Sequence, residues 1–265
     1  MNVYWSEQSE ADVPADNDWL SASEAVCLNG MRFAKRRADW RLGRWTTKRA
    51  LSVCLDVPAH PQIFKKMEIR AAPSGTPEVF YCDQPAAVTI SLSHRNGTAI
   101  CVVAMSAVEM GCDLEMIEPR SNAFVADYFT VEEQALVGHA SAADQPRLLA
   151  LLWSGKESTL KALRAGLRLD TRSVIVTPCI ASFDINCWNE LRVRYTGERH
   201  TGDHHTGGRV FHGWWQPSGN IVRTVVAAPP PDSPIRLRIP VYAFATPDRK
   251  VLCPKCARTS SLTAG

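Results

Sequence analysis

Two acidic residues, Asp113 and Glu115, stand one position apart at the end of an apolar run over residues 108–117. If that run is a strand, both side chains project to the same side, with Leu114 behind them. Two carboxylates held side by side repel each other unless a cation lies between them, and oxygen ligands favour Mg²⁺ or Mn²⁺ over zinc. An Asp-x-Glu pair is weak evidence alone. Gly111, which permits close backbone approach, and the apolar flanks strengthen it.

A second group of residues that could take part in chemistry lies in a predicted helix over residues 146–163. The leucines of this helix recur at helical spacing. Trp153, Lys156, Glu157 and Lys161 share one face of that helix, at i, i+3, i+4 and i+8. Glu157 would add a third carboxylate and could act as a general base, while the two lysines could neutralise charge on a leaving phosphate. The alternative is an exposed Lys-Glu-Lys set that only supports the helix.

A basic cluster precedes both motifs. Between residues 32 and 49 the chain carries eight basic residues and one acid, Asp39. This indicates a phosphate-bearing ligand or an acidic partner, with a solvated basic face as the alternative. A nucleic-acid-binding protein would use the same cluster, but it would leave the three carboxylates unexplained and would bind any duplex in a salt-dependent way. We therefore expect no nucleic-acid partner.

The elements that must position these residues alternate between helices and strands. The 265 residues are 45% hydrophobic with a net charge of +3, which suits one large domain or two half-sized ones in an α+β architecture. Helices are predicted at 23–55 (with Gly30 and Gly43 as interruptions), 123–128, 131–139 and 146–163. Strands are predicted at 3–5, 63–69, 79–82, 88–94, 98–105, 108–117, 173–176, 182–187, 191–195, 210–216, 221–228 and 235–244.

Composition also bears on location. The first 18 residues are acidic and polar, unlike a signal peptide, and no apolar run approaches a membrane span of about 20 residues. The nine cysteines are scattered, which favours a reducing, cytoplasmic compartment. Cys253 and Cys256 have zinc-knuckle spacing, but without a second pair we interpret them as part of a polar tail. The sequence shows no repeat that spacing alone would support.

Four motifs together resemble those of one enzyme family. They are Ser-Leu-Ser-His at 91–94, Gly-Cys-Asp-Leu-Glu at 111–115, Phe-Thr-Val-Glu-Glu at 129–133 and Trp-Ser-Gly-Lys-Glu-Ser-Thr-Leu-Lys at 153–161. In this order and at about this spacing, they resemble the 4′-phosphopantetheinyl transferases, in particular the larger, surfactin-synthetase-activating type. Residues 33–48 resemble the family's coenzyme A-binding region. The resemblance spans roughly residues 30–228. Cys112 stands where the family often has a larger aliphatic residue.

The resemblance implies a pseudo-twofold monomer of two similar α+β halves, residues 1–107 and 108–245, with a tail at 246–265. Coenzyme A would bind between the halves. The implied reaction moves phosphopantetheine from coenzyme A to a serine hydroxyl of an apo acyl or peptidyl carrier protein and leaves adenosine 3′,5′-bisphosphate. The alternative is a non-catalytic module of the same fold that binds coenzyme A or a carrier protein. No membrane partner is expected.

The resemblance also implies roles for individual residues. Asp113, Glu115 and Glu157 would bind Mg²⁺, with Mn²⁺ as the alternative ion, and Glu157 and Lys161 would be catalytic. Glu133 matches an acidic position of the family. The expected contacts to coenzyme A phosphates are Lys35, Arg37, Lys48, His94, Lys156 and Lys161.

Overall fold

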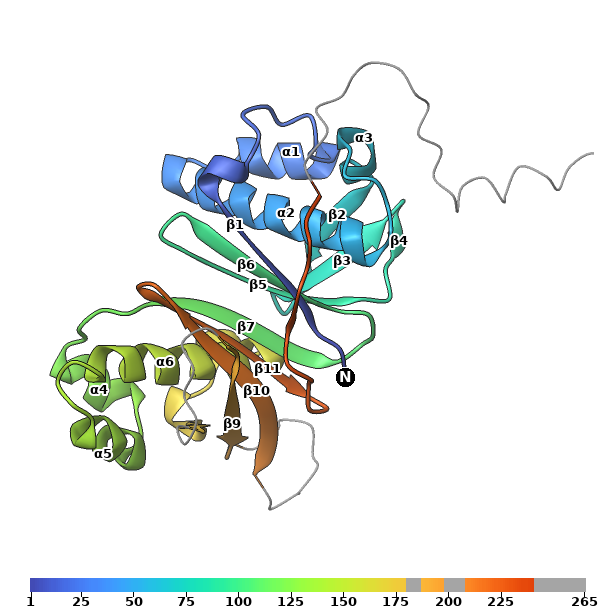
Figure 1. Ribbon diagram of the computed structural model, residues 1–265. Helices are drawn as coiled ribbons and strands as arrows, with labels where there is room; N and C mark the ends of the chain where they lie inside the picture. The colour runs from blue at the N-terminus through green and yellow to red at the C-terminus, as the bar shows by residue number, and fades with distance from the viewer. Residues whose placement is uncertain (180–186, 198–207, 241–265) are drawn as a thin grey trace, which may run out of the picture.

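Two β-sheets, each with a long helix packed on it, carry most of the chain (Figure 1). The computed structural model describes residues 1–179, 187–197 and 208–240. One sheet has the strand order β12-β1-β6-β5 and the other β7-β11-β10-β9-β8, and a small third sheet has the order β2-β3-β4. Helix α2 packs on β1, β5 and β6, and α6 packs on β7, β8 and β11. The predicted α+β class is confirmed.

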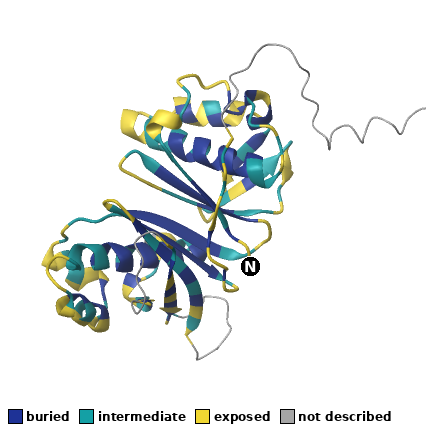
Figure 2. Ribbon diagram, viewed as in Figure 1, coloured by how far each residue is buried: buried dark blue, intermediate teal, exposed yellow. Residues whose placement is uncertain are grey.

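The elements before residue 107 form the first sheet, the small sheet and the helices above them. They are β1 (Tyr4–Ser9), the 3-10 helix η1 (Glu10–Asp12), α1 (Ala22–Asn29), α2 (Ala34–Cys54), α3 (Pro61–Phe64), β2 (Met67–Ala71), β3 (Pro77–Tyr81), β4 (Gln84–Pro85), β5 (Thr89–Arg95) and β6 (Thr98–Ala104). Figure 2 shows the inner face of α2 and the middle of the strands as buried.

The remaining elements build the second sheet and its cover. They are β7 (Glu109–Met116), α4 (Asn122–Tyr128), α5 (Val131–His139), α6 (Gln145–Ala162), η2 (Gly166–Arg168), η3 (Thr171–Ser173), β8 (Val174–Pro178), β9 (Asn189–Tyr195), β10 (Arg209–Ser218), β11 (Ile221–Ala228) and the short β12 (Ile235–Arg236). β12 returns to the first sheet, where it runs parallel to β1.

The same buried ion pair occurs once in each half. Lys48 of α2 binds Glu24 of α1, and Lys156 of α6 binds Glu133 of α5 at 2.8 Å. Both lysines are fully buried and also donate to two backbone carbonyls. Both glutamates close a capping box at the start of their helix. The architecture is thus duplicated, although the letters alone show no repeat.

The two glutamates even bind the sheet in the same way. Ile69 of β2 donates its backbone N–H to Glu24, and Val176 of β8 donates to Glu133. Each carboxylate therefore ties a short helix, a long helix and a strand together. These equivalent contacts support the expected pseudo-twofold relation between the halves. The boundaries at 107 and 245 stay predictions.

The halves meet through a shared apolar layer and several ion pairs. The layer joins side chains of β1 and β6 to side chains of β7 and β11, among them Trp5, Val102, Leu114 and Val225. Two nitrogens of the Arg223 guanidinium, on β11, donate to the two carboxylate oxygens of Glu7, on β1. The contact is therefore bidentate, and the Nη2–Oε1 distance is 2.7 Å. The relative placement of the halves therefore rests on both apolar burial and charged contacts.

Three expected elements differ from the structure. The helix predicted at 23–55 is two helices, since α1 ends at Gly30, whereas Gly43 continues α2 without a break. Residues 61–64 form α3, where a strand was predicted from residue 63, because His60 caps a helical turn through Gln62 N–H. The last strand is limited to Ile235–Arg236 within the residues described.

Several predicted segments fall outside the described ranges. They are most of the strand predicted at 182–187, residues 198–207 of a segment rich in Gly and His, and the tail with Cys253 and Cys256. In the described ranges, none of the helices has the length and apolar character needed to cross a membrane.

Candidate functional site

Gly111 brings β7 and α6 into direct contact. A Cβ atom at residue 111 would lie 1.8 Å from the carbonyl oxygen of Ser158 and 2.8 Å from the backbone nitrogen of Ala162, so only glycine fits there. The close approach sets the last two turns of α6 across β7. It thereby brings Glu157 and Lys161 beside the acidic residues of the strand.

Asp113 is the centre of the cluster. Its side chain is 7% exposed, and Oδ1 accepts hydrogen bonds from Lys161 Nζ at 2.8 Å and from Ser93 Oγ at 2.8 Å. Oδ2 is buried and has no hydrogen-bond partner among the described residues. A buried carboxylate oxygen without a donor costs free energy unless a ligand satisfies it. This atom is therefore an open ligand position.

Glu115 projects from the same side of β7, as the strand alternation predicts. Its Oε2 accepts from Arg120 at 3.0 Å, and Arg95 approaches the same oxygen at 3.9 Å. Burial and the charge of Asp113 raise the pKa of Glu115, and the two arginines only partly offset this. The raised pKa follows first from burial of the carboxyl and then from the neighbouring charge of Asp113.

Glu157, from α6, completes the cluster. Burial and the charges of Asp113 and Glu115 raise the pKa of Glu157, while Lys161 lowers it. Burial lowers the pKa of Lys161, but its neighbouring carboxylates outweigh that effect, and the net pKa is raised. Lys161 is therefore held firmly as a cation. It is 31% exposed, so it contacts Asp113 and can still reach a ligand.

Strand β5 joins the cluster from the other half. Ser91 Oγ accepts the backbone N–H of Cys112 at 2.9 Å, and Ser93 Oγ donates to Asp113. The two serines lie on the face of β5 that meets β7, whereas Leu92 packs in the first half's core. No role is predicted for these serines from the sequence, although the alternation in Ser-Leu-Ser could have indicated one. The contacts of Arg95 and Arg120 with Glu115 are likewise found only in the structure.

His94 follows these serines and opens onto a hollow of about 490 Å³ lined by Phe33, Lys35, Arg36, Asp39 and Trp40. Burial lowers the pKa of His94, and the nearby cations Lys161 and Lys35 add to this, against the charge of Asp39. His94 and Lys35, which are both expected phosphate contacts, thus line the same hollow. Arg37 is not part of this lining.

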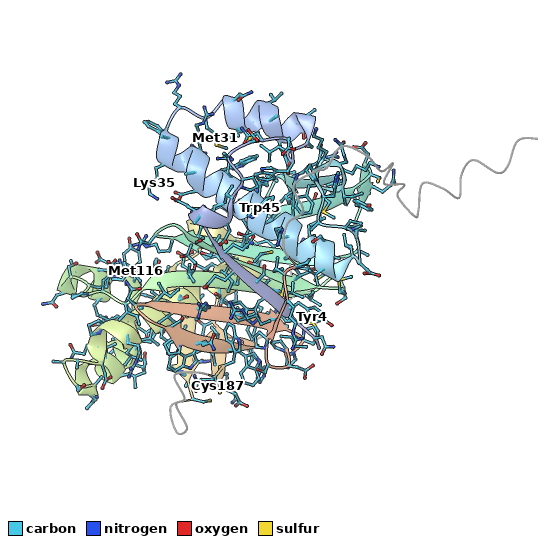
Figure 3. All side chains as sticks on the ribbon, turned by 45° about the horizontal axis from the view of Figure 1, so that its top comes forward. Tyr4, Met31, Lys35, Trp45, Met116 and Cys187 are labelled. Carbon is cyan, nitrogen blue, oxygen red and sulfur yellow. The ribbon has the colours of Figure 1, made fainter. Side chains whose placement is uncertain are left out.

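The start of α2 is open to ligands. Lys35 is 77% exposed and pairs with Asp39 at 3.1 Å. Figure 3 places Lys35 on the same side of the molecule as Met116, which ends β7. The basic residues at the start of α2 therefore lie toward the end of the molecule where the acidic strand ends.

Two of the expected phosphate contacts are wrong. Lys48 and Lys156 are fully buried, and each ammonium is satisfied by a glutamate and two carbonyls. Burial lowers the pKa of each lysine, and its glutamate partner counteracts this. A ligand phosphate cannot reach either ammonium without opening the core, so both are structural residues, and Glu133 belongs with Lys156.

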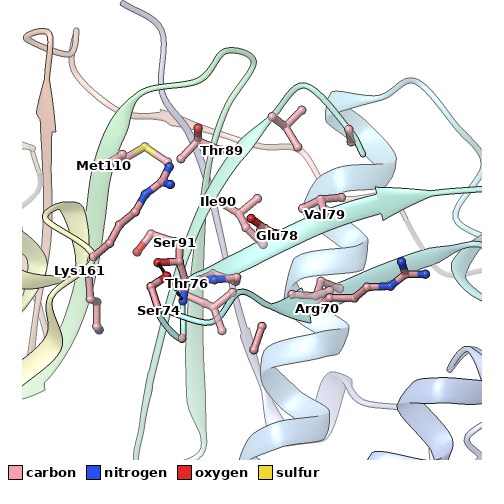
Figure 4. A pocket seen from close by; sticks show the side chains of 18 of the residues that line it. Arg70, Ser74, Thr76, Glu78, Val79, Thr89, Ile90, Ser91, Met110 and Lys161 are labelled. Atoms are coloured by element: carbon pink, nitrogen blue, oxygen red, sulfur yellow. Dashed lines mark hydrogen bonds between the residues drawn. The ribbon is translucent and has the colours of Figure 1, made fainter. Parts of the chain in front are cut away.

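A larger cavity of about 620 Å³ lies between the halves. Its lining includes Ser91 and Lys161 on the side of the acidic cluster, with Thr76 of the β2–β3 turn and Arg44 of α2 across from them. Figure 4 shows Ser74, Thr76, Ser91 and Lys161 among the side chains that line this cavity. The cavity can take an elongated ligand whose charged end meets Lys161.

The donor set fits a hard cation. The three carboxylates offer only oxygen, and Oδ2 of Asp113 lacks a hydrogen-bond partner among the described residues. Burial and the charge of Asp113 raise the pKa values of both Glu115 and Glu157. As the side chains stand in the described ranges, no three acidic, histidine or cysteine groups converge closely enough to chelate an ion. Lys161 contacts Asp113, and Arg120 holds Glu115.

Comparison with known proteins agrees with this site. Residues 109–208 match the family model described as the 4′-phosphopantetheinyl transferase superfamily. Two curated relatives, both named 4′-phosphopantetheinyl transferase AcpT, come from Salmonella typhi (30% identical) and Salmonella typhimurium strain LT2 (29% identical), each over 128 residues. Each match covers 48% of this chain and 58% of the relative, so the chain spans little more than half of their length. The segment matched by the family model contains the acidic cluster and Lys161, so this part of the chain is similar to the 4′-phosphopantetheinyl transferase superfamily.

Proposed function

We propose that this chain transfers the 4′-phosphopantetheine group of coenzyme A to a serine hydroxyl of an apo carrier protein. The observation that carries the proposal is the acidic cluster of Asp113, Glu115 and Glu157 with Lys161, set against a cavity between the halves. A metal-dependent diphosphate reaction needs oxygen ligands, a fixed cation and room for a long substrate, and this site combines all three.

The reaction is a displacement at phosphorus. The serine oxygen of the carrier forms a bond to the phosphorus that bears the pantetheine, and the bond from that phosphorus to the bridging diphosphate oxygen breaks. The leaving group is adenosine 3′,5′-bisphosphate. Glu157 takes the proton from the serine hydroxyl; its raised pKa makes it a stronger base than an ordinary carboxylate. Lys161 stabilises the negative charge that develops on the leaving phosphate.

Asp113, Glu115 and Glu157 would hold Mg²⁺ or Mn²⁺, which supplies positive charge to the diphosphate oxygens. Ser93 and Lys161 orient Asp113 through Oδ1 and leave Oδ2 for the ion. Arg120 fixes the position of the Glu115 carboxylate through a contact of 3.0 Å. Coenzyme A would lie in the 620 Å³ cavity, and His94 and Lys35 would contact a phosphate at its edge.

The carrier protein is assigned only as a class, acyl or peptidyl. We further propose that the protein resembles the larger, surfactin-synthetase-activating type of the family and acts as a monomer in the cytoplasm. The duplicated ion pairs in one chain support a monomer, because both halves of the pseudo-twofold come from the same chain. The cysteines among the described residues are free thiols, as a reducing compartment requires.

Transfer by two variants tests the proposal, with adenosine 3′,5′-bisphosphate release as the readout. Glu157→Gln keeps the side-chain volume but removes the base and a carboxylate, so we expect transfer to fall by at least about a hundredfold, the scale of a lost general base. Glu132→Gln, on the exposed side of α5, is the control and should retain full activity. Normal turnover by Glu157→Gln would remove Glu157 from the mechanism. Binding of coenzyme A without release by the unaltered chain would favour the alternative, a binding module.

A further inference from the structure

The duplicated fold contains a second cleft that corresponds to the active-site cleft. The turns β5–β6 and β10–β11 are equivalent, and both hairpins close on the same register, with Arg95 opposite Thr98 and Ser218 opposite Ile221. Cys101 is three residues after Thr98, and Thr224 is three residues after Ile221. Cys101 lies opposite Ser6 of β1, and Thr224 lies opposite Asp113 of β7. The counterparts on the two equivalent strands are therefore Ser6 for Asp113 and Gln8 for Glu115.

The two long helices supply the third counterpart. Because Lys48 and Lys156 occupy equivalent places in the two ion pairs, the next residue of α2, Arg49, corresponds to Glu157 of α6. Each acidic residue of the active cluster is thus replaced in the second cleft by a neutral or a cationic side chain. No divalent cation would be held by that set. Donors such as a guanidinium instead favour carbonyl oxygens or anions.

The chain's own segment 231–240 lies in this second cleft. Figure 1 shows it leaving the second half and running beside β1 to the helices of the first half. The backbone N–H groups of Asp232, Ile235 and Leu237 donate to the carbonyls of residues 1, 3 and 5 at 2.9, 2.9 and 2.8 Å. The donors Ile235 and Leu237 alternate along the segment and bind alternate carbonyls of the N-terminal strand, which is the pattern of an added parallel strand.

The far end of the segment meets the counterpart of the catalytic base. Arg49, which is 5% exposed, donates its guanidinium to the carbonyl oxygen of Pro240. A hollow of about 450 Å³ remains between β1 and the segment, with Ser6 and Gln8 on one wall and Arg236 on the other. Ser6 Oγ and Gln8 Oε1 are buried without a hydrogen-bond partner among the described residues. The cleft therefore has hydrogen-bonding groups that segment 231–240 leaves unsatisfied.

We propose that the second cleft is a peptide-binding groove, and that its occupant is the chain's own segment 231–240, bound as an extended strand. The duplicated fold has two clefts. One contains the carboxylates and binds the substrate. The other has Ser6, Gln8 and Arg49 at the equivalent positions and binds backbone carbonyls. The segment connects the halves, since it leaves β11 of the second half and ends on α2 of the first. One chain therefore presents one substrate cleft.

Hydrogen exchange on the full chain tests this occupancy. Ile235→Pro removes the amide that binds the carbonyl of Val3, and Ile235 is 44% exposed, so little packing is lost. We expect the Leu237 amide to exchange about tenfold faster in this variant, because the neighbouring strand contact is gone. Arg238→Pro, at an exposed position outside the three strand contacts, is the control and should leave the Leu237 amide protected. An unprotected Leu237 amide in the unaltered chain would overturn the proposal.

A peptide in trans gives a second, independent readout. The double variant Ile235→Pro with Leu237→Pro removes two of the segment's donors to β1. A labelled peptide of residues 231–240 should bind this double variant by fluorescence anisotropy and should not bind the unaltered chain, whose groove is filled. Failure to bind the double variant, or equal binding to both chains, would overturn the proposal. Neither arm uses coenzyme A, so the result is separate from the fate of the proposed transferase activity.

Discussion

At the scale of single residues, the site is defined by unbalanced negative charge. Among the described residues, Lys161 is the cation that contacts Asp113, whereas Arg95 and Arg120 share their charge between Glu115 and the neighbouring Glu118. Such an arrangement is unfavourable for folding by itself, and it persists where a ligand or reaction requires it. The residue types and spacing predicted this cluster, because strand alternation and helical spacing fix which side chains share a face.

The charge imbalance has a consequence for stability. Because the pKa values of Glu115 and Glu157 are raised in the folded chain, protons bind these groups more tightly there than in the unfolded chain. The two groups thus favour folding below their unfolded pKa, and this contribution is lost as the pH rises through the folded pKa. We expect Glu157→Gln to raise the melting temperature at about pH 7.5, and the gain to vanish near pH 4, where the carboxyl is protonated. Calorimetry at the two pH values checks this, and a lower melting temperature at neutral pH would contradict it.

Asp113 tests the metal assignment separately. Asp113→Asn keeps the size of the side chain but removes the charge at the open oxygen position. We expect Mn²⁺ binding, measured by electron paramagnetic resonance, to weaken by about tenfold or more, since each carboxylate ligand contributes strongly to hard-cation affinity. Asp127→Asn, on α4, is a matched control outside the cluster. Unchanged Mn²⁺ affinity in Asp113→Asn would exclude Asp113 as a ligand.

At the scale of elements, helix–strand contact decides whether the cluster forms. The sequence predicted β7 and α6 within a residue or two of their bounds. It did not predict that Lys156 is buried, although Leu149, Leu152 and Leu160 place that lysine on the apolar stripe. Sequence spacing says which residues share a face, but it does not identify the distant glutamate that makes a buried lysine tolerable.

Gly111 gives the sharpest element-scale prediction. In Gly111→Ala the new Cβ would meet the backbone of α6 at 1.8 Å, and a helix backbone cannot move aside as a side chain can. We expect loss of transfer and a marked drop in the free energy of unfolding, measured by denaturant titration. Gly138→Ala, where a Cβ meets nothing within 4 Å, is the control. Full activity in Gly111→Ala would show that the strand–helix approach is not needed.

The buried ion pairs give a matched pair of variants. Lys156→Met and Lys48→Met each leave a buried glutamate without its cation, which typically costs about 3–5 kcal/mol. We expect both to lower the free energy of unfolding by a similar amount, because the two lysines have equivalent partners. Equilibrium denaturation measures this. A stable Lys156→Met variant whose only defect is weak coenzyme A binding would restore Lys156 as a phosphate contact.

At the scale of the whole molecule, two copies of one architecture have diverged in chemistry. One cleft collects carboxylates from β7 and α6 with serines from β5, and the other holds segment 231–240 against β1. Family resemblance led to the expectation of two similar halves, but the equivalence of Glu24–Lys48 and Glu133–Lys156 is visible only in three dimensions. The amino-acid sequences around the two ion pairs differ, whereas the lysine–glutamate contacts themselves are repeated.

The halves are held together in part by Glu7 and Arg223, and this contact can be tested. Arg223→Met leaves the half-buried carboxylate of Glu7 without its bidentate partner, so the melting temperature should fall. The double variant with Glu7→Gln should recover part of the loss, because the unpaired charge is then also gone. A double-mutant cycle by thermal unfolding gives the coupling. Additive losses would show that the pair does not join the halves energetically.

The central claim is that the acidic cluster carries out phosphopantetheine transfer. Intact-mass spectrometry of an apo acyl or peptidyl carrier protein, after incubation with this chain, coenzyme A and Mg²⁺, tests it most directly, with a chelator as control. We expect a mass gain of one phosphopantetheine group on the carrier's serine, lost when the chelator is present. No gain on carriers of either type, from a chain that is folded and binds coenzyme A, would show that the acidic cluster does not carry out this transfer.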